Sequence, residues 1–318
     1  MKKSFKIIAL TAVLAVVMLF SLSGCSQTRY DIYLANNWDE NKVEISTYDV
    51  KYVINETETK GTLTTKIFRV NKDRKFKVNN EEYVGVNNAS YFEYTLEMDN
   101  SDKIHSEVLF ESYANQNFRP RHSFVTSTVD SKTSTLEIKY TDKEATLTSV
   151  VNGETTTVTT NVNKAVIYDN AQMIAMGRTL YFGQNGQLSF KVPSFHPEND
   201  KFELENGALG IISQTKANVK TEEQTEPEDK TFIKVNSGNV FEFGIAIATK
   251  NTVPAGLPIS LTIAKGNVTF DGQKNSSGND ILYNQPIIRI TEGNSKFYTF
   301  DAIVTNLQKV DFNEADFN

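Results

Sequence analysis

The sequence predicts a mainly β protein: a large curved antiparallel sheet, half-barrel or sandwich-like, with one short interposed helix near residues 169–181. Three observations lead to this fold class. Apolar and polar residues alternate with a period of two from residue 44 onward, which places an apolar row on one face of each strand. An Asn-Gly pair at residues 152–153 separates two stretches rich in Thr and Val, as in a type I′ hairpin. One segment, by contrast, has the apolar spacing of a helix.

The first 24 residues have the features of a secretory signal peptide. Three lysines precede an almost unbroken apolar run at residues 7–22, shorter than the roughly 20 residues that a membrane-spanning helix needs. The run ends in Leu22-Ser23-Gly24-Cys25, and Cys25 is the only cysteine of the chain. This stretch resembles the lipobox of bacterial lipoproteins. The resemblance implies cleavage before Cys25, acyl chains such as palmitate on its sulfur, and a lipid-anchored protein on the extracytoplasmic face of the cell membrane. The alternative is a chance cysteine inside an ordinary secretory signal.

Residues 25–43 are polar and lack periodicity, so we expect a flexible tether between the lipid and the folded domain. The alternation that follows favours an antiparallel sheet with one face toward solvent. Besides the pair at residues 152–153, Asn185-Gly186 and Asp271-Gly272 are candidates for tight turns. The apolar rows of the clearest strands are Tyr48, Val50, Tyr52 and Ile54; Phe92, Tyr94, Leu96 and Met98; and Leu136, Ile138 and Tyr140.

Residues 169–180 break the alternation and have the pattern of a helix. Asp169 or Asn170 is placed to cap the free amide groups of the first turn, and Arg178 lies in the last turn, where a cation suits the helix dipole. Either the helix covers an apolar hollow of the curved sheet, or its side chains form ordinary core. For the first case, the predicted ligand-binding residues are Met173, Ile174, Met176 and Leu180 as apolar contacts and Arg178 as the headgroup contact.

The middle of the chain resembles a group of uncharacterised bacterial envelope proteins. The residues that carry this resemblance are Arg119-Pro120 leading into a strand, a following hairpin, and Tyr168-Asp169-Asn170 opening a Met-rich helix. It covers about residues 48–190. It implies a curved antiparallel sheet with an interposed helix, and its motifs are non-catalytic, so no functional residue is transferred.

We divide the chain after the tether into three parts. Residues 44–217 form an antiparallel β domain with one helix, residues 218–230 an acidic loop or linker, and residues 231–318 a C-terminal β region that either continues the same sheet or forms a second domain. The predicted strands of this last part are 232–235, 241–248, 259–264, 287–290 and 297–304.

Composition excludes several functions. The formal net charge of −6 over 318 residues opposes binding to nucleic acid, because both partners are anionic. One cysteine cannot form an internal disulfide. No motif predicts a cofactor. The expected partners are the membrane, through the lipid anchor, and an apolar small molecule or another envelope protein.

The sequence contains no recognisable catalytic or metal-binding motif. His105, His122 and His196 lack ligand spacing, and we interpret them as solvent-facing or loop residues. Glu93 and Glu97 share a strand face but lie ~13 Å apart at ~3.3 Å per residue, too far for a glycosidase pair. Glu81 and Glu82 point to opposite faces, so an acid–base pair would have to form across strands.

Two polar stretches have a functional and a structural interpretation. The cluster Arg119-Pro120-Arg121-His122 is either an anion site or a strand start whose arginines pair with nearby carboxylates. The loop near residue 275 is either a calcium site with oxygen ligands or an ordinary hydrophilic turn. It does not match an EF-hand, because the twelfth position from Asp271, where that motif has Glu, is Leu282. Its oxygen-bearing residues are Asp271, Gln273, Asn275, Asn279 and Asp280.

The sequence therefore favours a non-enzymatic, membrane-anchored envelope lipoprotein with a binding or structural role, holding an apolar or lipid-like ligand. Two alternatives stay open. One is a tethered extracellular hydrolase acting on cell-wall or polysaccharide material, and the other is a surface adhesion module.

Overall fold

The computed structural model describes residues 42–70, 74–84, 89–113, 116–163, 165–178, 187–196, 201–215, 233–235, 240–248, 259–264, 267–294, 298–313 and 317. All of them belong to one compact unit, Ile32–Asn318. Cys25, Leu180, the Asn185-Gly186 pair and the acidic loop lie outside the described residues.

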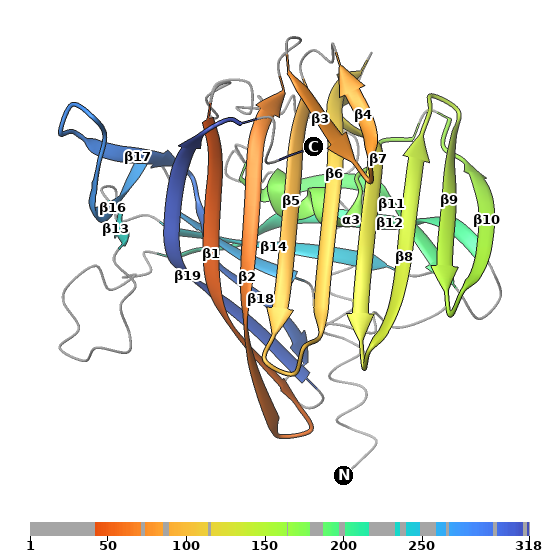
Figure 1. Ribbon diagram of the computed structural model, residues 1–318, viewed down its shortest axis with the longest axis horizontal. Helices are drawn as coiled ribbons and strands as arrows, with labels where there is room; N and C mark the ends of the chain where they lie inside the picture. Colours follow the sequence, from red (N-terminus) through yellow and green to blue (C-terminus); the bar gives the residue numbers. More distant parts are fainter. Residues whose placement is uncertain are drawn as a thin grey trace. The chain divides into compact units, whose positions relative to one another are not determined.

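Most strands belong to one antiparallel sheet of 14 strands, in the order β10-β9-β8-β7-β6-β5-β2-β1-β19-β18-β15-β14-β12-β11 (Figure 1). The first eight positions form an up-and-down meander in which sequence neighbours pair, apart from the β3–β4 insertion between β2 and β5. The strands of this N-terminal half are β1 Lys42–Ile54, β2 Thr57–Val70, β5 Ala89–Met98, β6 Lys103–Tyr113, β7 Gln116–Val129, β8 Lys132–Tyr140, β9 Glu144–Val151 and β10 Glu154–Asn161.

The C-terminal strands continue the same sheet. The strand β19 pairs with β1 along its whole length. Strands that follow residue 231 therefore share one sheet with strands that precede residue 217. The strands of this half are β11 Gln187–His196, β12 Lys201–Thr215, β14 Val240–Ala248, β15 Ile259–Ala264, β18 Ile287–Asn294 and β19 Tyr298–Asp311.

The helix α3, Asn170–Gly177, lies between the two halves of the sheet (Figure 1). It contacts β5 and β6 of the N-terminal half and β15 of the C-terminal half. The predicted cap is confirmed: the Asp169 side chain accepts from the Ala171 amide, and the Gln172 side chain accepts from the Asp169 amide, which completes a capping box. The helix ends at Gly177, earlier than predicted. Among the described residues, no helix is long and apolar enough to cross a membrane.

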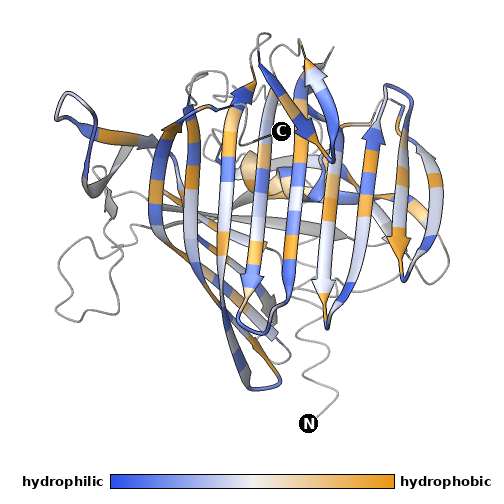
Figure 2. Ribbon diagram, in the orientation of Figure 1, coloured by the Kyte–Doolittle hydropathy of each residue, from blue (hydrophilic) through white to orange (hydrophobic). Residues whose placement is uncertain are grey.

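The predicted alternation is confirmed in the strands (Figure 2). In β1, Tyr48 and Val50 are buried, whereas Asp49 between them is exposed. The predicted hairpin joins β9 to β10, and its Asn152 and Gly153 have φ of 52° and 83°, as a type I′ turn requires. The Asp271-Gly272 prediction is wrong, because this pair lies inside β16; the β16–β17 turn closes instead at Asn275–Asn279.

Two smaller sheets also occur among the described residues. The β3–β4 hairpin consists of Lys75–Val78 and Glu81–Val84, and the other sheet pairs β13 Ile233–Val235, β16 Asn267–Lys274 and β17 Asp280–Asn284. The hairpin inserts Phe76 and Tyr83 into an aromatic cluster with Phe68 and Tyr91 of the main sheet; the last two stack with ring centroids 4.9 Å apart. Residues 89–93 of β5 are consequently buried on both faces, unlike the single wet face predicted from alternation.

Candidate functional site

Two adjacent residues of β7 point to opposite faces of the sheet, because successive side chains of a strand alternate. On one face, the Nδ1 atom of His122 lies 2.8 Å from the Tyr83 hydroxyl of the β3–β4 hairpin. On the other, the Ser123 hydroxyl donates to Asp169, the cap of α3, at 2.8 Å. We call the face that carries His122 the outer face and the face that carries Ser123 the inner face.

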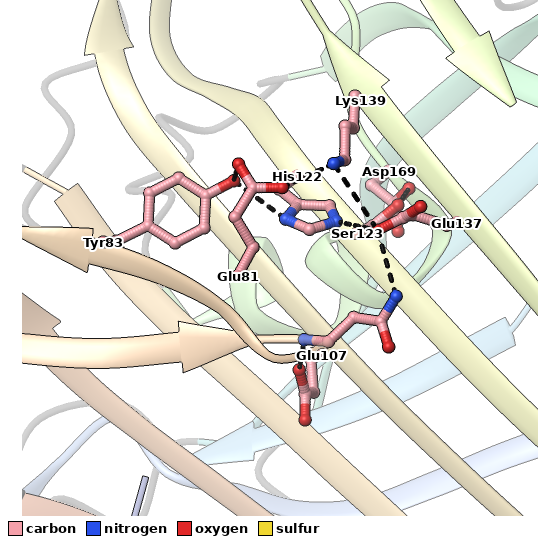
Figure 3. A network of polar contacts seen from close by, with 9 residues as sticks. Glu81, Tyr83, Glu107, His122, Ser123, Glu137, Lys139 and Asp169 are labelled. Atoms are coloured by element: carbon pink, nitrogen blue, oxygen red, sulfur yellow. Dashed lines mark hydrogen bonds and ion pairs between the residues drawn. The ribbon is translucent and has the colours of Figure 1, made fainter. Parts of the chain in front are cut away.

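Five side chains form a polar cluster on the outer face: Glu81 and Tyr83 from β4, His122 from β7, and Glu137 and Lys139 from β8 (Figure 3). The Nε2 atom of His122 lies 2.9 Å from Glu137 Oε1. The Tyr83 hydroxyl, besides its contact with His122, lies 3.2 Å from Glu81 Oε1. The Lys139 ammonium donates to Glu81 Oε2 at 2.5 Å and lies 3.8 Å from Glu137 Oε1. We call this group the outer-face cluster.

The turn of the β3–β4 hairpin fixes one side of the outer-face cluster. Asn79 and Asn80 have φ of 47° and 64°, the two positive values of a type I′ turn. The backbone amide of Asn79 donates to Glu107 Oε2 at 2.9 Å, and its side-chain amide donates to Glu137 Oε1 at 3.0 Å. The turn is therefore hydrogen-bonded directly to carboxylates of β6 and β8.

A bulge in β7 fixes the other side. The pairing with β6 passes from His122 directly to Pro120, so Arg121 is an extra residue in the ladder. Within sheets, proline is confined largely to edge strands and bulges, and Pro120 lies directly beside this bulge. The guanidinium of Arg121 lies 5.5 Å from the ring centroid of Tyr83 and 3.1 Å from a carboxylate oxygen of Glu111. The bulge thus holds a cation against the ring that contacts His122.

The charges of the cluster follow from these contacts. Burial lowers the pKa of His122, although Glu137 opposes this shift, so the imidazole is neutral at pH 7. The hydrogen bond from Lys139 lowers the pKa of Glu81, and that bond raises the pKa of Lys139. Burial acts to raise the pKa of Glu137, but hydrogen bonds from Asn79 and His122 outweigh it and hold the pKa below its ordinary value. The cluster therefore carries two carboxylates and one ammonium.

This arrangement is suited to holding a cation. One ligand atom each from Glu81, His122 and Glu137 lie within 4.8 Å of one another, and no other such group of three occurs among the described residues. The arrangement is poorly suited to glycoside hydrolysis, in spite of the short distance between the carboxylates. That reaction needs one carboxyl group with a raised pKa to act as general acid, whereas the pKa values of Glu81 and Glu137 are both lowered.

The inner face holds a second buried polar group, at the start of α3. Asp169 accepts hydrogen bonds from the hydroxyls of Ser123 and Tyr140, at 2.8 and 2.7 Å, and from the Ala171 amide. Burial nevertheless raises the pKa of Asp169. These three hydrogen bonds fix the start of the helix to β7 and β8.

The structure places most of the predicted ligand-binding residues between the two halves of the sheet. Met173 and Met176 are buried, and Ile174 is partly buried. Arg178 is buried as well, and its Nη1 atom lies 2.7 Å from Glu44 Oε1. A headgroup at Arg178 would have to compete with this carboxylate. The assignment of ligand binding to Met173, Ile174, Met176, Arg178 and Leu180 remains a prediction.

Sequence reasoning missed the outer-face cluster because it interpreted His122 as solvent-facing. That interpretation is wrong: His122 is 0% exposed, since the hairpin covers it. His105 is partly buried on β6 and contacts Glu107. His196 lies in β11, and its side chain is outside the described residues. The signal that could have revealed the hairpin is Asn79-Asn80, a turn pair that follows the alternating residues of β3.

The other polar stretches have structural partners. Arg121 pairs with Glu111, as the strand-start interpretation expected, and Arg119 donates to a backbone carbonyl oxygen, that of Thr141, at 2.7 Å. In the loop near residue 275, Asp280 pairs with Lys274 at 2.8 Å.

Comparisons with known proteins add little. No family model and no curated relative matches the chain. Among solved structures, the chain is similar to one described as an outer membrane lipoprotein-sorting protein domain from Vibrio parahaemolyticus, with 9% identity, a TM-score of 0.27, and coverage of 90% of this chain and 93% of that chain. A likeness at this TM-score carries no argument about function.

Proposed function

We propose that the protein is a lipid-anchored envelope protein with a non-enzymatic binding or structural role outside the cytoplasm. The observation that carries the proposal is the stretch Leu22-Ser23-Gly24-Cys25 at the end of an apolar signal segment. Acylation explains why the chain has a single cysteine at this position. It also supplies the membrane affinity that an acidic protein would not obtain from basic residues, provided that at least two acyl chains are attached.

The mass of the protein extracted from membranes tests the anchor. We expect a chain that starts at Cys25 and is heavier than its sequence by the attached lipid. We expect Cys25→Ser to abolish this added mass. A processed protein with an unmodified thiol at its N-terminus would contradict the proposal.

A binding role is supported by the position of α3. The helix places Met173 and Met176 between two halves of one sheet, and methionine adapts to apolar partners of different shapes. The proposed ligand is an apolar or lipid-like molecule that contacts Met173, Ile174, Met176 and Leu180, with Arg178 nearest its polar end.

Native mass spectrometry of the full chain carrying Cys25→Ser tests this role, because that variant has no covalent lipid of its own. We expect a co-purifying apolar molecule that organic extraction releases. The matched variant Met176→Lys places a charge among the apolar contacts and should reduce the bound fraction. A Cys25→Ser protein that contains no such molecule, and takes up none from vesicles, would leave only the structural role.

The hydrolase alternative has one observation in its favour, namely the short distance between the Glu81 and Glu137 carboxylates. It lacks the asymmetry in pKa that acid–base catalysis needs, because the ammonium of Lys139 keeps Glu81 ionised and Asn79 does the same for Glu137. The binding role is therefore the better supported.

A further inference from the structure

The outer-face cluster has the composition of a transition-metal site. Two carboxylates and one neutral imidazole converge from three strands, and these are ligands that zinc and related divalent ions accept. We propose that Glu81, His122 and Glu137 bind a divalent transition-metal ion, Zn²⁺ in the first instance. This inference is independent of the proposed function.

The spacing of the ligands is close to that of an occupied site. Bonds of 2.0–2.2 Å in a tetrahedral arrangement separate ligand atoms by roughly 3.3 Å. His122 Nε2 and Glu137 Oε1 are already 2.9 Å apart, and one ligand atom each from Glu81, His122 and Glu137 lie within 4.8 Å of one another. The Glu81 side chain is 42% exposed, so it can move the remaining distance without disturbing the core. Solvent then supplies the fourth ligand.

The hydrogen bonds of the cluster can accommodate a cation at Nε2 of His122, in place of the hydrogen that this nitrogen shares with Glu137. The Tyr83 hydroxyl has one hydrogen but faces two acceptors, His122 Nδ1 at 2.8 Å and Glu81 Oε1 at 3.2 Å. A metal ion on Nε2 leaves the hydrogen of the neutral ring on Nδ1. That nitrogen then donates to Tyr83, and the Tyr83 hydroxyl is free to donate to Glu81. Such an outer partner on the second ring nitrogen is typical of metal-binding histidines.

A positive charge already occupies the region between the carboxylates. The Lys139 ammonium lies 2.5 Å from Glu81 Oε2 and 3.8 Å from Glu137 Oε1. The Lys139 side chain is 51% exposed and flexible, so an entering metal ion can displace it. The ammonium therefore acts as a competitor that sets the affinity for the metal.

Zn²⁺ titration of the full-length protein in detergent micelles, in competition with a chromogenic chelator, tests the proposal. We expect one Zn²⁺ per chain. Mutating a residue that only hydrogen-bonds to a metal ligand typically lowers metal affinity roughly 10–100-fold. Because Glu137 and Glu81 are themselves proposed ligands, we expect Glu137→Gln and Glu81→Gln each to lower the Zn²⁺ affinity by at least this factor. Lys139→Gln removes the competing charge and should tighten binding roughly tenfold.

His105→Gln is the matched control. His105 also contacts a glutamate, with its Nε2 2.9 Å from Glu107 Oε1, but it belongs to no group of three ligands among the described residues. We expect His105→Gln to leave Zn²⁺ affinity unchanged. Glu81 and Lys139 are exposed, so their variants remain informative even if a variant of the buried His122 fails to fold. The proposal is overturned if the wild-type chain takes up no stoichiometric Zn²⁺, if Glu81→Gln leaves the affinity intact, or if Lys139→Gln does not raise it.

Discussion

The guanidinium of Arg178 lies 2.7 Å from the carboxylate of Glu44, and the two side chains are only 6% and 4% exposed. Arg178 directly follows α3, and Glu44 lies in β1 next to Ile67 of β2. The Nε atom of Arg178 also donates to the Gln285 carbonyl oxygen at 3.1 Å. The pair thus connects the end of the helix to the centre of the sheet and to the β17–β18 connection.

Removing one partner of this pair should be strongly destabilising, because it leaves the other charge buried and uncompensated. We expect Glu44→Gln or Arg178→Met alone to lower the free energy of unfolding by about 3–5 kcal/mol. The double variant Glu44→Gln/Arg178→Met should lose less than the sum of the two. Urea denaturation of the four proteins measures this double-mutant cycle.

The ion pair between Arg289 and Asp301 is the control for that cycle. It has good two-bond geometry, with both nitrogen–oxygen distances at 2.7 Å, but the Arg289 side chain is 50% exposed. We expect Asp301→Asn to cost at most about 1 kcal/mol. Equal losses at the two pairs would show that burial does not determine their contribution.

The capping carboxylate of α3 gives the second prediction. Asp169→Ala removes the cap and leaves the hydroxyls of Ser123 and Tyr140 without an acceptor. We expect a loss of about 2–4 kcal/mol in the free energy of unfolding. Asp169→Asn keeps a capping oxygen and should cost clearly less. Urea denaturation measures the free energy of unfolding of both variants. Equal losses would show that the hydrogen bonds accepted by Asp169 do not account for its contribution to stability.

Local patterns were sufficient to predict several strands, the β9–β10 hairpin and the helix. The burial of Tyr48 and Val50 around the exposed Asp49 follows from alternation alone, and the turn at Asn152-Gly153 follows from the residues that tolerate positive φ. Such features depend on neighbours in sequence, so they can be read from it directly.

The outer-face cluster depends on contacts that no local pattern encodes. Glu81, His122 and Glu137 come together because a short hairpin lies on one face of the sheet and because a bulge at Arg121 shifts the register of β7. Strand order and bulge positions arise from packing across the whole sheet, and a shift of one residue would move His122 to the opposite face. The folding of the sheet over α3 is a long-range property of the same kind.

Two glycines are required for different physical reasons, which gives the third prediction. A Cβ on Gly61 of β2 would fall far inside contact distance of the Glu97 backbone carbonyl oxygen, whereas a Cβ on Gly153 would meet nothing within 4 Å. We expect Gly61→Ala to cost about 1–3 kcal/mol through steric overlap with the neighbouring strand. Gly153→Ala should cost only about 1 kcal/mol, because its φ of +83° is strained for a residue with a Cβ. Thermal unfolding of both variants tests the order of the two losses.

His105 should give the protein a pH-dependent contribution to stability that grows toward acid. The hydrogen bond to Glu107 raises the pKa of His105 above 6.5 against the effect of burial, and the charge of Glu93 adds to the shift. Because the folded state holds this proton more tightly than the unfolded state, the stabilisation is complete below pH 6.5 and is lost as the pH rises through the folded pKa.

His105→Gln keeps the size of the side chain but cannot titrate. The difference in free energy of unfolding between wild type and His105→Gln should therefore be larger near about pH 5.5 than near about pH 8.5, while the other titrating groups contribute equally to both proteins. Urea denaturation at the two pH values measures it, and a difference that is constant or grows with pH would show that His105 is not charged through its contact with Glu107.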